Sequence, residues 1–123
     1  VIVGGPVSQP VAALGSSFVV REWTMSGPRY LHTHLYDDEA FHVLEGALTF
    51  RFADGETVAP SGTTIFVPAG VAHTYSAADG SRYLIILTPK LDRLIARLLA
   101  IPAEKYDAEL RDTLAEFDTV ISE

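Results

Sequence analysis

Two histidines separated by one residue, His32 and His34, constrain this 123-residue chain more than any other feature of its sequence. On an extended strand both imidazoles leave the same face, about 7 Å apart along the backbone, so both can reach one metal ion at roughly 2.1 Å each. Glu39 follows five residues after His34, an odd step that regular alternation would turn to the opposite face. If Glu39 is to join the pair, the chain must bend or bulge near residues 35–38, and the polar run 36–38 suits such a bend.

A second stretch places the fourth histidine of the chain, His73, just after a strand bounded by turns at Gly62 and at Pro68-Ala-Gly70. A lone His-x-His pair is usually a surface feature, but here a carboxylate and a further imidazole accompany it. Such a set leaves coordination positions on a metal ion open. Burying these groups without an ion would leave unpaired donors and a carboxylate in a cavity, which is costly. The residues therefore favour a metal site.

Together the two stretches resemble the paired motifs of the cupin superfamily. The first motif reads His-x-His, four residues, Glu, six residues, Gly, and the second reads Gly, five residues, Pro-x-Gly, two residues, His. Two positions depart from the pattern: four residues instead of five separate Gly27 from His32, and Ala77 stands where the second motif often ends in Asn. The resemblance implies one divalent transition-metal ion (Fe, Mn, Ni, Co, Cu or Zn), which ligand type alone does not identify. Its implied ligands are His32, His34, Glu39 and His73.

Short segments of strand character, separated by turn residues, make up most of the chain. Residues 1–15 carry Gly and Pro punctuation and predict an irregular arm or an edge strand. The regular spacing of the segments favours a β-sandwich or small barrel, and the cupin resemblance implies an all-β double-stranded β-helix, a jelly-roll barrel. The expected strands are residues 17–25, 32–34, 40–44, 47–52, 56–58, 63–67, 73–77 and 82–87.

The last third of the chain predicts two α-helices. Thr88-Pro89 is an N-cap residue followed by proline at the first helical position, and apolar residues recur at helical spacing from Leu91 to Leu99. Pro102 ends this helix, and a second is expected from Ala103 with an apolar stripe that runs to Ile121. Such stripes are more often core or interface surfaces than cofactor sites. We expect one domain overall, in which residues 1–88 form the barrel and residues 89–123 a helical extension on its outside or on a partner subunit.

Composition excludes several classes of function. The formal net charge of −7 argues against a nucleic-acid partner, for which a basic footprint is expected. No apolar run approaches the ~20 residues that span a bilayer, so no membrane partner is expected. The chain has no cysteine, which removes disulfides, thiolate ligands and cysteine nucleophiles, and a cytoplasmic location is the prediction.

Several aromatic residues and one further histidine are candidates for the surroundings of the site. If Glu39 and Phe41 face inward, His42 faces outward, so an outer-sheet or interface role is expected for it. Tyr75 shares its strand face with His73 and could touch a substrate or simply fill the barrel, two alternatives that the sequence leaves open. The candidates for substrate contact are Tyr30, Phe41, Phe50 and Tyr75.

The function is less determined than the site. The chain is similar to the quercetin-dioxygenase-like cupins, and this implies a metal-dependent dioxygenase-like enzyme for a small enol, catechol or flavonol-type substrate, with Glu39 as ligand or base. One alternative is a redox-neutral isomerase or lyase whose metal acts as a Lewis acid. Another is a non-catalytic small-molecule-binding cupin. The sequence holds no second cluster of acid, base or nucleophile that would separate these.

The expected strand 82–87 is apolar on both faces, since Leu84 and Ile86 alternate with Ile85 and Leu87. One face fills the barrel, and the other needs a cover, either the C-terminal helices or a second subunit. The family resemblance favours a homodimer.

Overall fold

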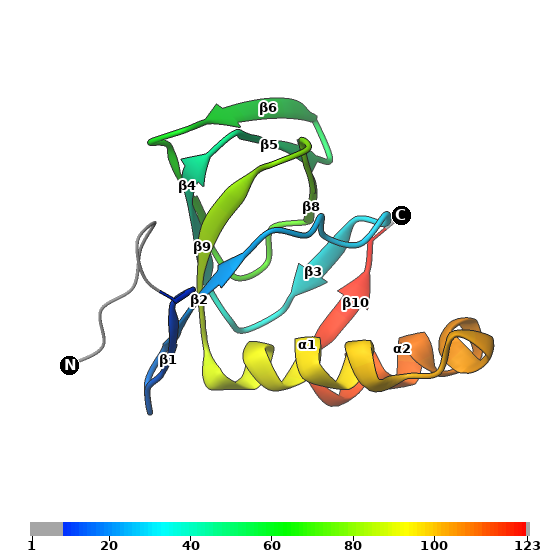
Figure 1. The fold of residues 1–123 in the computed structure, drawn as a ribbon. Coiled ribbons are helices and arrows are strands. Elements are labelled where there is room, and N and C mark those ends of the chain that lie inside the picture. The colour runs from blue at the N-terminus through cyan, green and yellow to red at the C-terminus, as the bar shows by residue number, and fades with distance from the viewer. Residues whose placement is uncertain (1–8, 123) are drawn as a thin grey trace.

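Two five-stranded antiparallel β-sheets face each other in this computed structural model, which describes residues 9–122 (Figure 1). Sheet A has the strand order β1-β2-β9-β4-β7 and sheet B the order β10-β3-β8-β5-β6. The prediction of an all-β jelly roll with two C-terminal helices is confirmed; residues 1–8 of the expected arm lie outside the described residues. The strands are β1 (Ala12–Leu14), β2 (Val19–Trp23), β3 (His32–His34), β4 (Glu39–Glu45), β5 (Ala47–Phe52), β6 (Gly55–Pro60), β7 (Thr64–Val67), β8 (His73–Ala77), β9 (Arg82–Leu87) and β10 (Thr119–Ile121).

The core lies between the two sheets because the inner face of each strand is apolar. Along β9, Tyr83, Ile85 and Leu87 are buried, while the residues between them are half-buried. From sheet B, Leu48 and Phe50 of β5 are fully buried against this layer. The alternation read from the sequence therefore matches the faces of the strands.

Residues 35–38 carry the chain from β3 in sheet B to β4 in sheet A, and this is the bend that the sequence required. This bend moves the chain from one sheet to the other, whereas a bulge would only shift the alternation of side chains within one strand. Since Glu39 is the first residue of β4, its side chain enters the interior from the sheet opposite the His-x-His strand.

The turn between β4 and β5 depends on Gly46. Its φ of 77° lies in the left-handed region that glycine adopts without strain. A Cβ atom at this position would lie only 2.4 Å from Oγ of Ser81, and that hydroxyl bonds the backbone of Ala47. The turn that starts β5 is therefore packed closely against the residue before β9.

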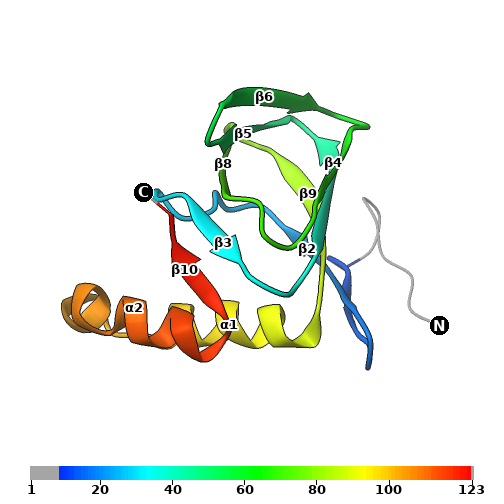
Figure 2. The same cartoon turned by 180° about the vertical axis from the view of Figure 1, so that it is seen from behind.

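The two helices, α1 (Pro89–Ala100) and α2 (Tyr106–Glu116), lie along one end of the sheets, and a short 3₁₀ turn, η1 (Ala103–Lys105), precedes α2 (Figures 1 and 2). Thr88 caps α1 by accepting a hydrogen bond from the backbone N–H of Leu91, as predicted. Arg21 of β2 forms a bidentate ion pair with Asp92 of α1, in which Nε of Arg21 lies 2.5 Å from the carboxylate. Leucines of both helices join the core cluster, so α1 and α2 pack with the sheets.

Within residues 9–122, no helix combines the length and the apolar character needed to cross a membrane. The longer of the two helices, α1, has 12 residues. The cytoplasmic location stays a prediction.

The expectation that the second helix continues to Ile121 is wrong. α2 ends at Glu116, Asp118 adopts a positive φ of 52°, and residues 119–121 form strand β10. β10 pairs antiparallel with β3, with Thr119 opposite His34 and Ile121 opposite His32. The edge of β3 offers backbone partners from a distant part of the chain, and these outweigh the helical spacing of the apolar residues.

Candidate metal centre

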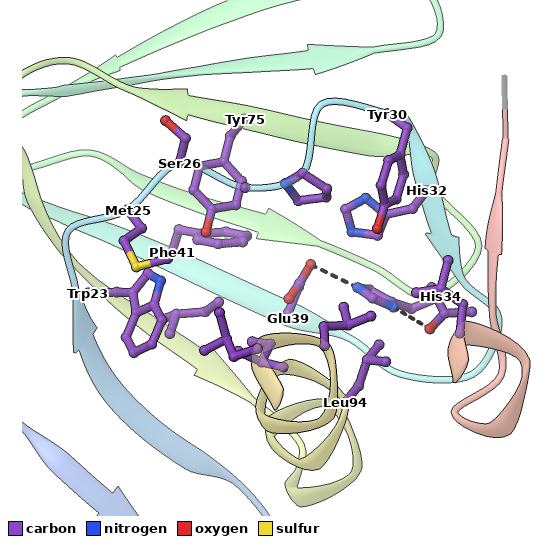
Figure 3. A pocket seen from close by; sticks show the side chains of 18 of the residues that line it. Trp23, Met25, Ser26, Tyr30, His32, His34, Glu39, Phe41, Tyr75 and Leu94 are labelled. Atoms are coloured by element: carbon purple, nitrogen blue, oxygen red, sulfur yellow. Dashed lines mark hydrogen bonds and ion pairs between the residues drawn. The ribbon is translucent and has the colours of Figure 1, made fainter. Parts of the chain in front are cut away.

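Three histidines and one glutamate meet inside the molecule, between the two sheets; Figure 3 shows three of the four, His32, His34 and Glu39. His32 and His34 come from β3, and His73, the first residue of β8, pairs with His32 across sheet B. Glu39 enters from β4 of sheet A. The exposed fraction of each residue is 7% or less, so the four groups form a buried polar cluster.

Distances within the cluster suit a shared ion. Oε1 of Glu39 lies 2.5 Å from Nε2 of His73 and 3.3 Å from Nε2 of His34. One ligand atom from each of the four residues lies within 4.8 Å of all the others. Ligands that bind one ion at about 2.1 Å lie at most about 4.2 Å apart, so small side-chain movements suffice. These four residues could bind a metal ion.

The pKa shifts of Glu39 and His32 suit metal ligands, whereas at His73 burial is outweighed by the hydrogen bond and the charge of Glu39, which raise the pKa. Burial opposes ionisation of Glu39, but hydrogen bonds with His34 and His73 outweigh it and hold the pKa of the carboxyl well below its usual range. Burial lowers the pKa of His32 to about 3, and the neighbouring His73 and His34 act in the same direction. At neutral pH the cluster therefore offers a carboxylate and at least one neutral imidazole, the forms that bind metal.

Hydrogen bonds on the far side of the rings orient two of the imidazoles. Nδ1 of His73 lies 2.9 Å from the carbonyl oxygen of Val71, which can only accept, so Nδ1 carries a proton. Nδ1 of His34 lies 2.8 Å from the hydroxyl of Thr119 in β10. Nδ1 of His32 is buried and has no hydrogen-bond partner among the described residues. The Nε2 atoms of His34 and His73 therefore face Glu39 and the space that an ion would fill.

An apolar cavity of about 250 Å³ opens onto His32, His34 and Glu39 (Figure 3). Within residues 9–122, no lysine or arginine borders it. Among the described residues, Glu39 supplies the only carboxyl group on its wall, and burial raises the pKa of the phenol of Tyr75. The remaining wall is formed by Trp23, Met25, Ser26, Gly27, Pro28, Tyr30, Phe41, Tyr75, Ile85, Leu94, Ile95, Leu98, Leu99, Tyr106, Leu114 and Thr119.

The aromatic candidates from the sequence occupy two layers. Tyr30, Phe41 and Tyr75 border the cavity. The hydroxyl of Tyr83 donates its proton to the backbone carbonyl of Met25. In the 2.7 Å contact between the hydroxyls of Tyr75 and Tyr83, Tyr75 is therefore the donor. Phe50 is fully buried behind Phe41, with ring centroids 5.0 Å apart, and does not border the cavity.

His42 lies outside the cluster, as the alternation of β4 predicts. Its Nδ1 bonds Oγ1 of Thr64 at 2.7 Å, on the outer face of sheet A. His42 and Phe41 are neighbours in sequence, yet only Phe41 is fully buried. Strand parity thus separates His42 from the four clustered residues.

Sequence reasoning missed the contribution of the C-terminal segment to the cavity. Leu94, Ile95, Leu98 and Leu99 of α1 border it, although the apolar stripe was expected to pack outside the barrel. Their periodicity was the available signal, but a stripe does not show which surface it meets. Thr119 gave no signal, because only its pairing opposite His34 brings it to the site.

The fold and the buried cluster define a small jelly-roll protein with a candidate metal centre. The model of the family described as "Cupin domain" matches residues 19–88, more than half of the chain, and the chain belongs to this family. No curated protein matches the chain.

Solved structures share the fold. A protein of Neisseria meningitidis, NMB1881, is 27% identical, and the match covers 65% of this chain and 83% of that one with a TM-score of 0.54. A cupin-2 domain containing protein from Shewanella frigidimarina is 28% identical over 63% of this chain and 78% of that one, with a TM-score of 0.56. A sugar phosphate isomerase of the cupin superfamily from Silicibacter pomeroyi is 28% identical over 59% and 51%, with a TM-score of 0.51.

Proposed function

We propose that this cupin is a metal-dependent, dioxygenase-like enzyme for a small organic substrate of the enol, catechol or flavonol type. The observation that carries the proposal is the apolar, aromatic cavity that opens directly onto His32, His34 and Glu39. One divalent transition-metal ion, held by these residues and His73, would supply open coordination positions and redox or Lewis-acid chemistry.

The side chains of the cavity wall favour a substrate with an uncharged ring and disfavour one with a phosphate or carboxylate group. A buried anion needs a charged or hydrogen-bonding partner, and no cationic side chain of the described residues borders the cavity. Tyr30, Phe41 and Tyr75 offer ring faces and edges against which an aromatic substrate can pack. A volume of about 250 Å³ is slightly below the ~300–1,000 Å³ typical of ligand pockets, which favours a small substrate.

Glu39 would serve as a ligand and as the base. In the metal-free cluster, hydrogen bonds with His34 and His73 hold its pKa low and make it a weak base. If the carboxylate separates from these partners in the working site, its basicity rises, and it can take the proton of a substrate hydroxyl. Its position at the cavity wall permits direct contact with that hydroxyl.

A redox-neutral isomerase or lyase is the second candidate function. It is favoured by the likeness to the sugar phosphate isomerase of Silicibacter pomeroyi. The same metal ligands would then polarise a carbonyl or hydroxyl of the substrate without dioxygen. The lack of a cation in the described cavity wall speaks against a phosphate group on that substrate.

Dioxygen consumption tests the proposal. The metal that copurifies is identified by elemental analysis, and the protein loaded with it is offered enediols, catechols and flavonols in an oxygen-electrode cell. We expect substrate-dependent oxygen uptake by the wild-type protein and by His42→Ala, and none by His34→Ala. Product formation without oxygen uptake would establish the isomerase or lyase instead, and saturable binding without any product would establish a binding protein.

We also propose that the protein forms a homodimer through the outer face of sheet A. Leu84 and Ile86 are only half-buried and are absent from the core cluster that α1 and α2 join, and Phe66 is 62% exposed. The register places Ala40 between Ile86 and Phe66, so these side chains form one continuous apolar row. A second copy would cover this row.

Light scattering tests the dimer. At micromolar concentration the wild-type protein should have twice the mass of the 13.3 kDa chain, while Ile86→Lys, which places a charge in the row, should be monomeric. Val58→Lys, at an exposed position of β6 in the other sheet, should leave the mass unchanged. A wild-type mass of a single chain would contradict the dimer.

A further inference from the structure

We propose that Thr119, in the C-terminal strand β10, is a positioning residue for the candidate metal ligand His34. Its hydroxyl determines which nitrogen of the imidazole carries the proton, and it thereby leaves Nε2 of His34 free for an ion. The inference rests on the proposed metal function of the cluster. It gives a role to a residue that lies outside the segment matched by the family model, residues 19–88.

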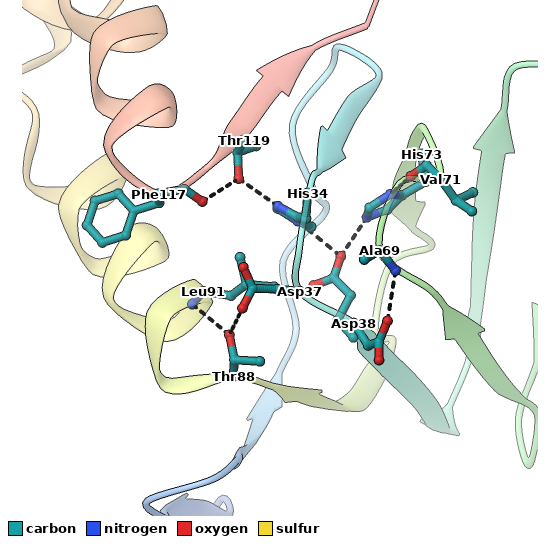
Figure 4. A network of polar contacts seen from close by, with 11 residues as sticks. His34, Asp37, Asp38, Ala69, Val71, His73, Thr88, Leu91, Phe117 and Thr119 are labelled. Atoms are coloured by element: carbon teal, nitrogen blue, oxygen red, sulfur yellow. Dashed lines mark hydrogen bonds and ion pairs between the residues drawn. The ribbon is translucent and has the colours of Figure 1, made fainter.

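A chain of two hydrogen bonds carries the argument (Figure 4). Oγ1 of Thr119 donates its only proton to the carbonyl oxygen of Phe117 at 3.2 Å, and a carbonyl can only accept. The contact of 2.8 Å between Nδ1 of His34 and the same hydroxyl then has the imidazole as its donor. With Nδ1 as the donor to Thr119, Nε2 is the remaining ligand atom of His34; in the metal-free cluster it lies 3.3 Å from Glu39 and donates to that carboxylate, and an ion would replace this proton.

The surrounding structure keeps this hydroxyl in place. Thr119 is 1% exposed and lies directly opposite His34 in the β10–β3 register. The backbone N–H of Leu35 donates to the carbonyl of Asp118 at 2.8 Å, next to this pair. The carboxylate of Asp118 also accepts a hydrogen bond from Lys90 of α1. The chain is therefore held in place at Asp118, the residue directly before Thr119.

The other two imidazoles show why His34 depends on this contact. His73 is oriented by the carbonyl of Val71, which belongs to its own loop, and Nδ1 of His32 has no partner in the described part of the chain. His34 alone among the three takes its orienting partner from the C-terminal segment. Partners that orient metal-bound histidines typically contribute ~10–100-fold in metal affinity. By linkage, an ion bound to His34 also stabilises the docked position of β10.

Zinc titration of metal-stripped protein, against a competing chelator, tests the role of Thr119. Thr119→Val keeps the shape of the side chain but cannot accept the proton of Nδ1, so we expect ~10–100-fold weaker Zn²⁺ binding. Thr119→Ser keeps the hydroxyl and should restore affinity to within about threefold of the wild type. The matched control is Thr113→Val in α2, since Thr113 is buried but neither borders the cavity nor bonds a ligand. Circular dichroism checks that each variant folds.

Imidazole ¹⁵N NMR of the metal-stripped proteins at alkaline pH gives a readout that a merely structural role would not move. We expect the proton of His34 on Nδ1 in the wild type and in Thr119→Ser, and loss of this defined state in Thr119→Val. Wild-type affinity and an unchanged His34 signal in Thr119→Val would overturn the role of Thr119, as would equal weakening in Thr113→Val. Failure of the wild-type protein to bind Zn²⁺ would instead overturn the metal function on which the inference rests.

Discussion

Replacing His34 by alanine should abolish tight metal binding, whereas replacing His42 should preserve it. His34 is 7% exposed and its Nε2 lies 3.3 Å from Glu39, so its loss removes one of the four proposed ligands and admits water to the site. The expected weakening exceeds the ~100-fold that an outer partner of a metal ligand contributes at most. His42 bonds Thr64 on the outer face of sheet A, and its loss should change the affinity by less than about threefold.

Titration of metal-stripped preparations with Zn²⁺ and with Co²⁺ measures both affinities, with circular dichroism as the folding control. Each variant removes one imidazole, His34→Ala from the inner face of β3 in sheet B and His42→Ala from the outer face of β4 in sheet A. If His42→Ala lost the ion while His34→Ala retained it, the strand register and the proposed ligand set would both be wrong. Equal losses in the two variants would point to general destabilisation rather than to a ligand.

Leu91→Ala should destabilise the protein strongly, while Leu99→Ala on the same helix should have little effect on stability. Leu91 is 1% exposed within the core cluster, and truncating such a buried leucine typically costs about 2–5 kcal/mol in the free energy of unfolding. Leu99 is 59% exposed, so its truncation should stay within about 0.5 kcal/mol. Urea denaturation of the metal-free variants, followed by circular dichroism, measures the difference.

This comparison tests whether α1 is part of the cooperative fold. Leu91 does not border the cavity, so a stability loss there reports the packing of the helix and not the loss of a ligand contact. A Leu91→Ala variant as stable as Leu99→Ala would show that α1 is an appendage. A separate, earlier transition in the wild-type protein would lead to the same conclusion.

Spacing along the chain determined much of the candidate site. A step of two on a strand places His32 and His34 on one face whatever the strand pairs with, and the same parity places His42 on the outer face of β4. The need for a bend before Glu39 also followed from parity. Which sheet Glu39 would come from did not follow, because the bend at residues 35–38 leads into the facing sheet, a relation between distant strands.

The C-terminal segment shows where local patterns fail. Helical spacing of apolar residues continued past Glu116 to Ile121 and suggested a longer helix, whereas Thr119-Val120-Ile121 is a β-branched run that suits a strand. Local preferences of this kind differ by less than about 1 kcal/mol per residue, so backbone bonds to the edge of β3 can decide between them.

The sequence by itself determined most of the strands, the start of the first C-terminal helix and the chemistry of four candidate ligands, because these depend on neighbours within a few residues. Only the tertiary structure decided that α1 borders the cavity and that β10 closes the edge of β3 beside the site. The position of Thr119 against His34 depends on residues 85 positions apart in the chain. The physical reason is that periodicity shows which side of an element is apolar, while the surface it meets depends on packing between elements far apart in sequence.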